Sequence, residues 1–185
     1  MQRRNFLNQA LCGVAGGTLI FTTSEAQSPI KSKPFVVKNG KSRFGENTKL
    51  GGISPNDIKI SSKDTDGQLT VFEHIGREKG GPPLHIHLFQ DEVFFIQEGK
   101  YKFQVGDETH YLAVGDMIFL PRNIPHAFAQ LSDFGKMLFF FQPSGKMEDF
   151  FRVLGSLTEQ PSPQEGAKIF AAHDMKVVGV PLSLD

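Results

Sequence analysis

The chain has 185 residues, with 20 Lys and Arg against 20 Asp and Glu and a formal net charge of zero at pH 7. This balance, with no basic stripe, argues against a nucleic acid or an anionic membrane surface as the partner. Cys12 is the only cysteine, which excludes an internal disulfide.

Residues 1–26 have the plan of a cleaved export signal. Arg3 and Arg4 precede an apolar, glycine-bearing run at 11–21, and small residues stand at the −3 and −1 positions of a cut after Ala26. The run is too short for a membrane span. The arginine pair resembles a twin-arginine signal but lacks its usual flanking residues, so the ordinary secretory route stays open. We expect a periplasmic or extracellular protein without a thiol and not attached to a membrane; the alternative is an N-terminal helix packed on the domain.

The region from residue 27 to residue 145 favours strands. Residues 27–50 are polar and are expected to form an N-terminal arm, with a short edge strand at 34–38. Residues 51–145 contain short runs punctuated by Gly, Pro and Asp, which predict an all-β antiparallel sandwich or barrel. Besides the histidine-bearing stretches described below, the expected strands span residues 56–63, 69–75, 101–105, 110–114, 117–120, 126–131 and 136–142.

Residues 146–185 change to a helical pattern and are expected to form a C-terminal helical extension. Apolar residues at helical spacing predict a helix at 146–154. A second helix is expected at 164–173, with Ser162 as its N-cap. Two short helices of this kind would most simply cover one outer face of a sheet. For residues 177–184 the sequence leaves two alternatives, a return along the barrel or a frayed end.

Four side chains form a candidate metal site. His85 and His87 are two residues apart, so both project from one face of a β-strand. Glu92 follows a polar turn expected at 88–91, which brings the carboxylate back beside them. His126 ends a stretch whose two prolines favour a rigid turn. Three imidazoles and a carboxylate suit one divalent transition metal (Fe, Mn, Ni, Cu, Co or Zn), and suit Ca or Mg poorly.

The two stretches resemble the two motifs of the cupin superfamily. The first motif reads Gly, several residues, His-x-His, a short gap, Glu, six residues, Gly, and it matches here from His85 to Gly99. The second reads Gly, five residues, Pro-x-Gly-x-x-His, and it matches from Gly115 to His126. The resemblance covers residues 65–145 and implies a single double-stranded β-helix, or jelly-roll barrel, with short C-terminal helices.

The chain departs from the family pattern at two positions. Asn123 stands where the family usually has Gly, and Gln130 where Asn is common. Asn tolerates positive φ better than other non-glycine residues, so we expect the turn to be kept. The tail that begins at Pro143 looks like the one that follows small quercetin-2,3-dioxygenase-like cupins.

The alternation set by the ligands also predicts a pocket. Phe94 and Ile96 should face inward beside Glu92, and Phe128 beside His126, as the walls of a substrate pocket. The alternative is that these residues only fill the core. The remaining histidines fall outside the ligand register and are interpreted as structural or exposed: His74, His110 and His173. Glu73 is a minor candidate, either for a base or for a residue that supports the metal ligands, and Asp91 and Glu98 are interpreted as solvated turn carboxylates.

The resemblance implies a metal-dependent dioxygenase that acts on a small aromatic or phenolic, flavonol-like substrate. Glu92 would be its catalytic residue, as a ligand or as the base that takes a phenol proton. Two alternatives stay open: a non-catalytic cupin that binds a metal and a small molecule, and a metal-dependent isomerase or decarboxylase. Whether the chain is an enzyme is therefore undecided, and so is the homodimerisation through an edge strand that is common in the family.

Overall fold

A computed structural model describes residues 33–46 and 48–185. The expected export signal, residues 1–26, lies outside the described residues, as do residues 27–32 of the expected arm. The expected edge strand at 34–38 is wrong, because residues 33–38 have no regular secondary structure. In the described part of the chain no helix has both the length and the apolar character needed to cross a membrane.

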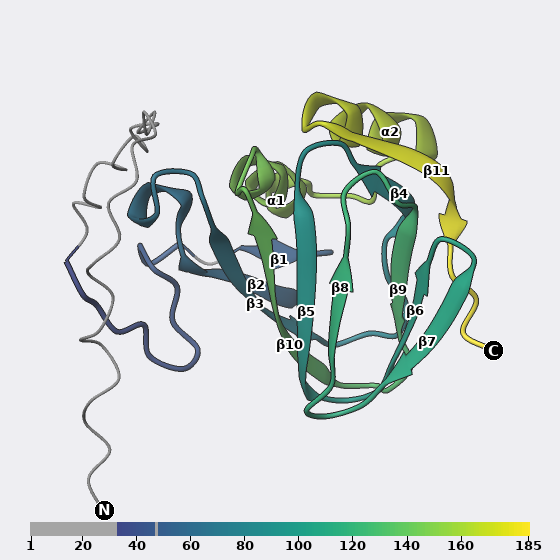
Figure 1. The fold of residues 1–185 in the computed structure, drawn as a ribbon, viewed down its shortest axis with the longest axis horizontal. Helices are drawn as coiled ribbons and strands as arrows, with labels where there is room; N and C mark the ends of the chain where they lie inside the picture. The colour runs from purple at the N-terminus through teal and green to yellow at the C-terminus, as the bar shows by residue number, and fades with distance from the viewer. Residues whose placement is uncertain (1–32, 47) are drawn as a thin grey trace, which may run out of the picture.

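Two antiparallel sheets form the body of the molecule (Figure 1). The six-stranded sheet has the order β1 (Lys49–Leu50), β2 (Ser54–Ile60), β3 (Thr70–Gly76), β10 (Gly135–Gln142), β5 (Asp91–Glu98), β8 (Met117–Leu120). The five-stranded sheet has the order β11 (Met175–Pro181), β4 (Pro83–His87), β9 (His126–Gln130), β6 (Tyr101–Val105), β7 (Glu108–Leu112). This confirms the expected all-β jelly-roll barrel.

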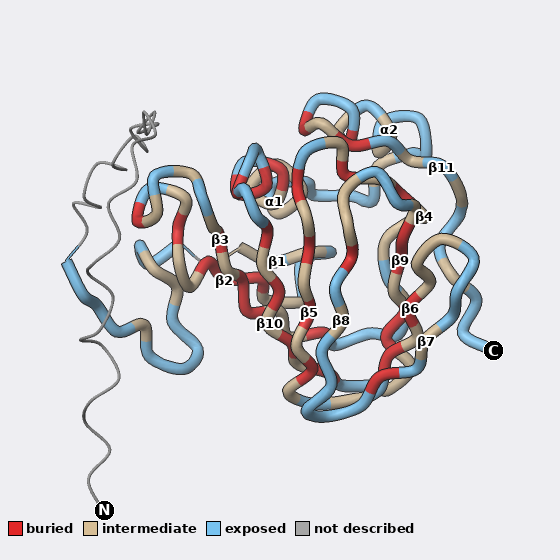
Figure 2. Tube along the Cα trace, in the orientation of Figure 1, coloured by how far each residue is buried: buried red, intermediate tan, exposed pale blue. Residues whose placement is uncertain are grey.

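Buried and partly buried residues alternate along the inner strands, as the tube in Figure 2 shows. On β10, Met137, Phe139 and Phe141 face the core, while the residues between them face outward. The alternation follows from the pleat, which sends successive side chains to opposite faces. Phenylalanine rings fill the space between the sheets, and those of Phe72 and Phe139 stack at 5.1 Å.

Strand register arranges the inward-facing side chains of the six-stranded sheet in rows. The near row is Thr70, Phe141, Glu92 and Leu120. The middle row is Ile58, Phe72, Phe139, Phe94 and Ile118. The far row is Asn56, His74, Met137 and Ile96. Neighbouring rows are two residues apart along each strand.

Two helices follow the last strand of the motif region. The helices α1 (Met147–Ser156) and α2 (Pro163–Ala172) agree with the expected positions, and Ser162 caps α2 through a reciprocal capping box with Glu165. They lie at the same end of the barrel (Figure 1). The expectation that they cover an outer sheet face is wrong, since Phe151 of α1 packs against inner-face rings, at 4.8 Å from that of Phe72.

A buried carboxylate attaches α1 to the six-stranded sheet. Glu148 accepts hydrogen bonds from the hydroxyls of Ser61, at 3.1 Å, and Thr70, at 3.0 Å, and from the backbone N–H of Ser62. Burial raises the pKa of Glu148, but these donors outweigh that effect and lower it below its ordinary value. The chain then returns as β11 along β4, so of the alternatives left open for residues 177–184 the return along the barrel holds as far as Pro181, and residues 182–184 have no regular secondary structure.

Candidate metal centre

β4 carries the first two candidate ligands. The side chains of His85 and His87 are buried and point into the barrel from the same face of the strand. β4 lies between β11 and β9, and its register places His85 opposite His126. The approach to β4 needs glycine at position 81, where a Cβ would lie 1.9 Å from the carbonyl oxygen of Phe128. The glycine thus lets the chain run against β9 on its way to His85.

Glu92 reaches the site from the other sheet. The chain turns at residues 88–90, as expected, and β5 begins at Asp91. The structure corrects the interpretation of Asp91 as a solvated carboxylate. Its two oxygens accept hydrogen bonds from the Arg122 guanidinium at 3.0 and 2.7 Å, and one also accepts the backbone N–H of Arg122 at 2.8 Å. This clamp joins the start of β5 to the turn that leads to His126.

The turn before His126 has the conformation that the sequence predicted. Asn123 adopts a φ of 66°, which confirms that it replaces the usual glycine without loss of the turn. Its backbone N–H donates to the carbonyl of His87 at 2.8 Å. The turn that carries His126 is therefore bonded directly to the strand that carries the first two histidines.

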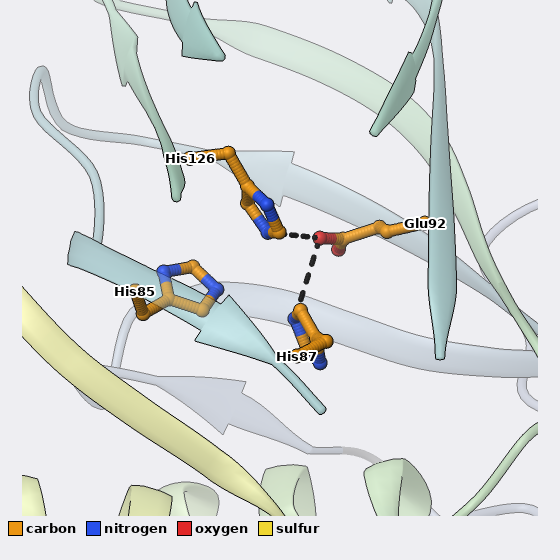
Figure 3. A group of neighbouring side chains, drawn as sticks. All are labelled: His85, His87, Glu92 and His126. Carbon is orange, nitrogen blue, oxygen red and sulfur yellow. Dashed lines mark ion pairs between the residues drawn. The ribbon is translucent and has the colours of Figure 1, made fainter. Parts of the chain in front are cut away.

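The four side chains converge on one point (Figure 3). One potential ligand atom from each residue lies within 4.8 Å of the other three. Oε2 of Glu92 is 3.2 Å from Nε2 of His126 and 3.5 Å from Nε2 of His87. Ligand atoms held about 2.0–2.2 Å from a single ion lie roughly 3–4 Å apart, so a small side-chain adjustment would suffice.

Hydrogen bonding fixes two of the imidazoles. Nδ1 of His85 lies 2.8 Å from the carbonyl of Pro83, and Nδ1 of His126 lies 3.0 Å from that of Ile124. A carbonyl only accepts, so each Nδ1 carries a proton and Nε2 is the nitrogen left to face a metal. Nε2 of His126 is buried and has no hydrogen-bond partner. A buried imidazole nitrogen without a hydrogen-bond partner, 3.2 Å from a carboxylate oxygen, fits a divalent transition metal.

The electrostatics of the cluster also favour a cation. Burial lowers the pKa of His85 to about 3, and the neighbouring His126 and His87 add to this effect. Burial alone raises the pKa of Glu92, but the imidazoles of His126 and His87 outweigh it and lower the pKa to about 2. At neutral pH the site therefore presents a neutral His85 imidazole and an ionised carboxylate, both in the form that binds a metal.

The cluster opens into a cavity of about 860 Å³. Phe94 and Phe128 line it beside the ligands, as expected. Ile96 is fully buried but is absent from the lining, so the expectation that it walls the pocket does not hold. Its side chain belongs to the hydrophobic core instead. Phe170 of α2 lies against His85, with ring centroids 5.3 Å apart, and so covers the site on the side of the helices.

Several other interpretations change with the structure. Glu73 is not a candidate base, because it pairs with Lys59 and Lys136 at 3.0 Å and is absent from the cavity lining. His74, interpreted as structural or exposed, lines the cavity, and so does Asn56, which the sequence did not single out. Their alternation with Phe72 and Ile58 could have indicated an inward orientation. The expectations for the other three residues hold: Glu98 is exposed, the His110 side chain is 41% exposed at the edge strand, and His173 is buried against α1.

Gln130, the second departure from the family pattern, has a structural role. It is buried, and its amide donates to the carbonyls of Gly76, at 3.3 Å, and Ser132, at 2.9 Å. Its oxygen accepts the Tyr101 hydroxyl at 3.3 Å. The side chain thus ties the end of β3 to the opposite sheet.

Comparison with known proteins identifies relatives of this arrangement. Residues 72–141 match the family model described as a cupin domain. Quercetin 2,3-dioxygenase of Bacillus subtilis (strain 168) is 30% identical over 127 residues, which are 69% of this chain and 36% of that protein. An uncharacterised protein of Streptomyces coelicolor is 35% identical over 54 residues, 29% of this chain and 51% of that protein. The chain thus spans about a third to a half of these relatives.

Two solved structures share the architecture. An RmlC-like cupin from Shewanella frigidimarina superposes with a TM-score of 0.52 at 18% identity, covering 64% of this chain and 96% of that one. KdgF from Halomonas sp. gives a TM-score of 0.50 at 15% identity, covering 60% and 94%. At such identities the likeness concerns the fold alone. The match at 72–141, the paired sheets and the His, His, Glu, His cluster together show that this chain is a cupin-type protein.

Proposed function

We propose that this cupin is a metal-dependent dioxygenase that acts on a small aromatic or phenolic, flavonol-like molecule. The observation that carries the proposal is the position of the ligand cluster, which lies in the wall of a cavity of about 860 Å³ whose lining includes phenylalanines from both sheets and both helices. Such a cavity has the size and apolar character of a site for a compact organic ligand. The similarity to the Bacillus subtilis quercetin 2,3-dioxygenase supports the choice of substrate class.

The chain supplies positioning and proton transfer. His85, His87, His126 and Glu92 would hold the metal, which contributes Lewis-acid and redox chemistry when bound. The carboxylate of Glu92, which is ionised at neutral pH and points into the cluster, would accept a phenolic proton at Oε2. The aromatic body of the substrate would lie against Phe94 and Phe139 in the middle row.

The helices have a part in the proposed reaction as well. Phe150 and Phe151 of α1 and Phe170 of α2 line the same cavity. Because they close the end of the barrel above His85, they would exclude water from the bound substrate. Dry surroundings strengthen the electrostatic interactions of an ionised carboxylate with its proton donor.

Oxygen uptake tests the proposal directly. The purified protein, loaded in turn with Fe, Mn, Ni, Cu, Co and Zn, is mixed with quercetin in an oxygen-electrode cell. We expect uptake that requires both a redox-active metal and the flavonol, and that disappears in the variant His85→Ala/His126→Ala. The variant His110→Ala, altered outside the cluster, serves as the matched control.

The other outcomes separate the alternatives. Tight flavonol binding without oxygen uptake for any of the metals would contradict an oxygenase and indicate a non-catalytic binding protein. Conversion of a substrate without oxygen uptake would indicate an isomerase or decarboxylase. Uptake that persists in the double variant would show that the cluster is not the site of reaction.

A further inference from the structure

The far row contains two polar side chains without partners. Asn56 on β2 and His74 on β3 are directly opposite each other in the strand register, and both line the cavity that contains the four candidate metal ligands. Asn56 is 0% exposed, and neither its side-chain oxygen nor its nitrogen has a hydrogen-bond partner. Nδ1 of His74 is likewise buried and unpartnered.

Buried polar atoms without hydrogen-bond partners lower the stability of a folded protein. An amide without hydrogen bonds has lost its hydration and gained nothing in exchange, so an apolar side chain would be more stable at the same place. Gln130, in the same cavity, shows the contrast: its amide bonds to Gly76 and Ser132 and its oxygen accepts from Tyr101. The side-chain oxygen and nitrogen of Asn56 and Nδ1 of His74 are therefore available to hydrogen-bond a ligand, because no group in the described residues bonds to them.

The rows define the shape of the ligand. Four residues separate the near row, which contains Glu92, from the far row, a distance of about 13 Å along a strand. Between them stand the rings of Phe94 and Phe139, stacked at 5.4 Å and both in the cavity lining. A molecule that touches both ends has an aromatic or flat apolar body with a polar group at each end.

We propose that Asn56 and His74 form a second, polar subsite that selects substrates with an uncharged hydroxyl or carbonyl group at the end away from the metal. That one end of the ligand binds the metal depends on the proposed function. The subsite itself is inferred from the unpartnered atoms of Asn56 and His74. An amide offers both a donor and an acceptor and no charge. Burial lowers the pKa of His74 to about 4, so its imidazole is neutral as well. Two neutral groups match a hydroxyl or carbonyl better than a carboxylate or phosphate.

A matched pair of flavonols tests the subsite. Quercetin and 3-hydroxyflavone share the metal-binding edge, but only quercetin carries hydroxyls on its outer rings. We expect the metal-loaded full-length protein to bind quercetin about tenfold more tightly, the change that one well-made hydrogen bond of 1.4 kcal/mol gives. Asn56→Leu and His74→Phe should each lose most of this preference while their metal content and their affinity for 3-hydroxyflavone stay unchanged. His110→Phe is the control outside the cavity.

A second measurement needs no ligand. Asn56→Leu removes the unpartnered amide, so the melting temperature of the ligand-free protein should rise; a structural role for Asn56 would make it fall. A wild-type protein that binds both flavonols equally, or variants that keep the preference, would overturn the subsite. Binding of neither flavonol would contradict the proposed substrate class, and the melting temperature then decides: a rise supports the subsite and a fall overturns it.

Discussion

At the scale of single residues, the orientation of the imidazoles comes from very local contacts. His85 and His126 each donate Nδ1–H to the carbonyl two residues earlier, that of Pro83 in one case and Ile124 in the other. His87 has no such bond, and its ring packs instead against Phe141, at 5.2 Å between centroids. Two of the histidines are thus oriented by backbone that the sequence places beside them, and the third by packing across the barrel.

Glu92 is the residue whose replacement should separate chemistry from metal binding. Glu92→Gln keeps the shape and one ligand oxygen but removes the charge that accepts a proton. We expect oxygen uptake with quercetin to fall by about 100-fold or more, while the metal content measured on the same sample falls much less. An equal loss of uptake and of metal would show that Glu92 acts only as a ligand.

The partly buried His74, whose Nδ1 is shielded from solvent, gives a pH dependence of stability. Its folded pKa, about 4, lies below the ordinary 6.5, so the unfolded chain binds the proton more tightly. Its contribution to the free energy of unfolding is therefore complete above pH 6.5 and is lost as the pH falls toward 4, by about 3 kcal/mol at most. Urea unfolding of the metal-free protein should show a shallower decline between pH 7 and pH 4 for His74→Phe than for the wild type. Equal slopes would contradict a neutral, partly buried His74.

At the scale of elements, the site is assembled by bonds between turns. The turn before β9 is bonded to β4 through Asn123 and His87, and to β5 through Arg122 and Asp91. None of these bonds involves a ligand side chain, yet together they place His126 opposite Glu92. A rigid arrangement of this kind holds the metal ligands in place before the metal binds.

Loss of the Asp91 clamp should therefore weaken metal binding from outside the ligand set. Asp91→Ala removes the acceptor for the side chain and the backbone N–H of Arg122. We expect roughly tenfold weaker metal affinity with little change in the number of sites, as is usual for groups that orient ligands. Competition titration with a chromogenic chelator measures the affinity. Asp133→Ala, which breaks an exposed pair with Lys79, should leave it unchanged, and a similar affinity in both variants would contradict the role of the clamp.

At the scale of the whole molecule, much of the architecture could be predicted from patterns in the sequence. Alternating apolar residues and turn residues place most strands within two or three residues of their observed ends, and the spacing of His85, His87, Glu92 and His126 brings four ligands together. These features depend on local periodicity. The position of α1 and α2 at the mouth of the barrel could not be predicted, because it depends on contacts such as Phe151 with the inner-face rings.

The polar subsite was missed for a related reason. Whether Asn56 and His74 lie side by side depends on the register between β2 and β3, which no single strand determines. In the same way, Asp91 is a turn carboxylate by sequence, and only the partner Arg122, brought there by the barrel, makes it part of the support for the site. The roles of Asn56, His74 and Asp91 depend on partners that are distant in the sequence, so the local sequence pattern does not reveal them.

The central claim, that the four side chains bind one metal ion, is tested most directly by elemental analysis of the purified protein after reconstitution. We predict about one equivalent of a divalent transition metal per chain in the wild type and in His110→Ala, and close to none in His85→Ala/His126→Ala. The same metal content in the double variant, or no metal in the wild type after exposure to Fe, Mn, Ni, Cu, Co and Zn, would contradict it.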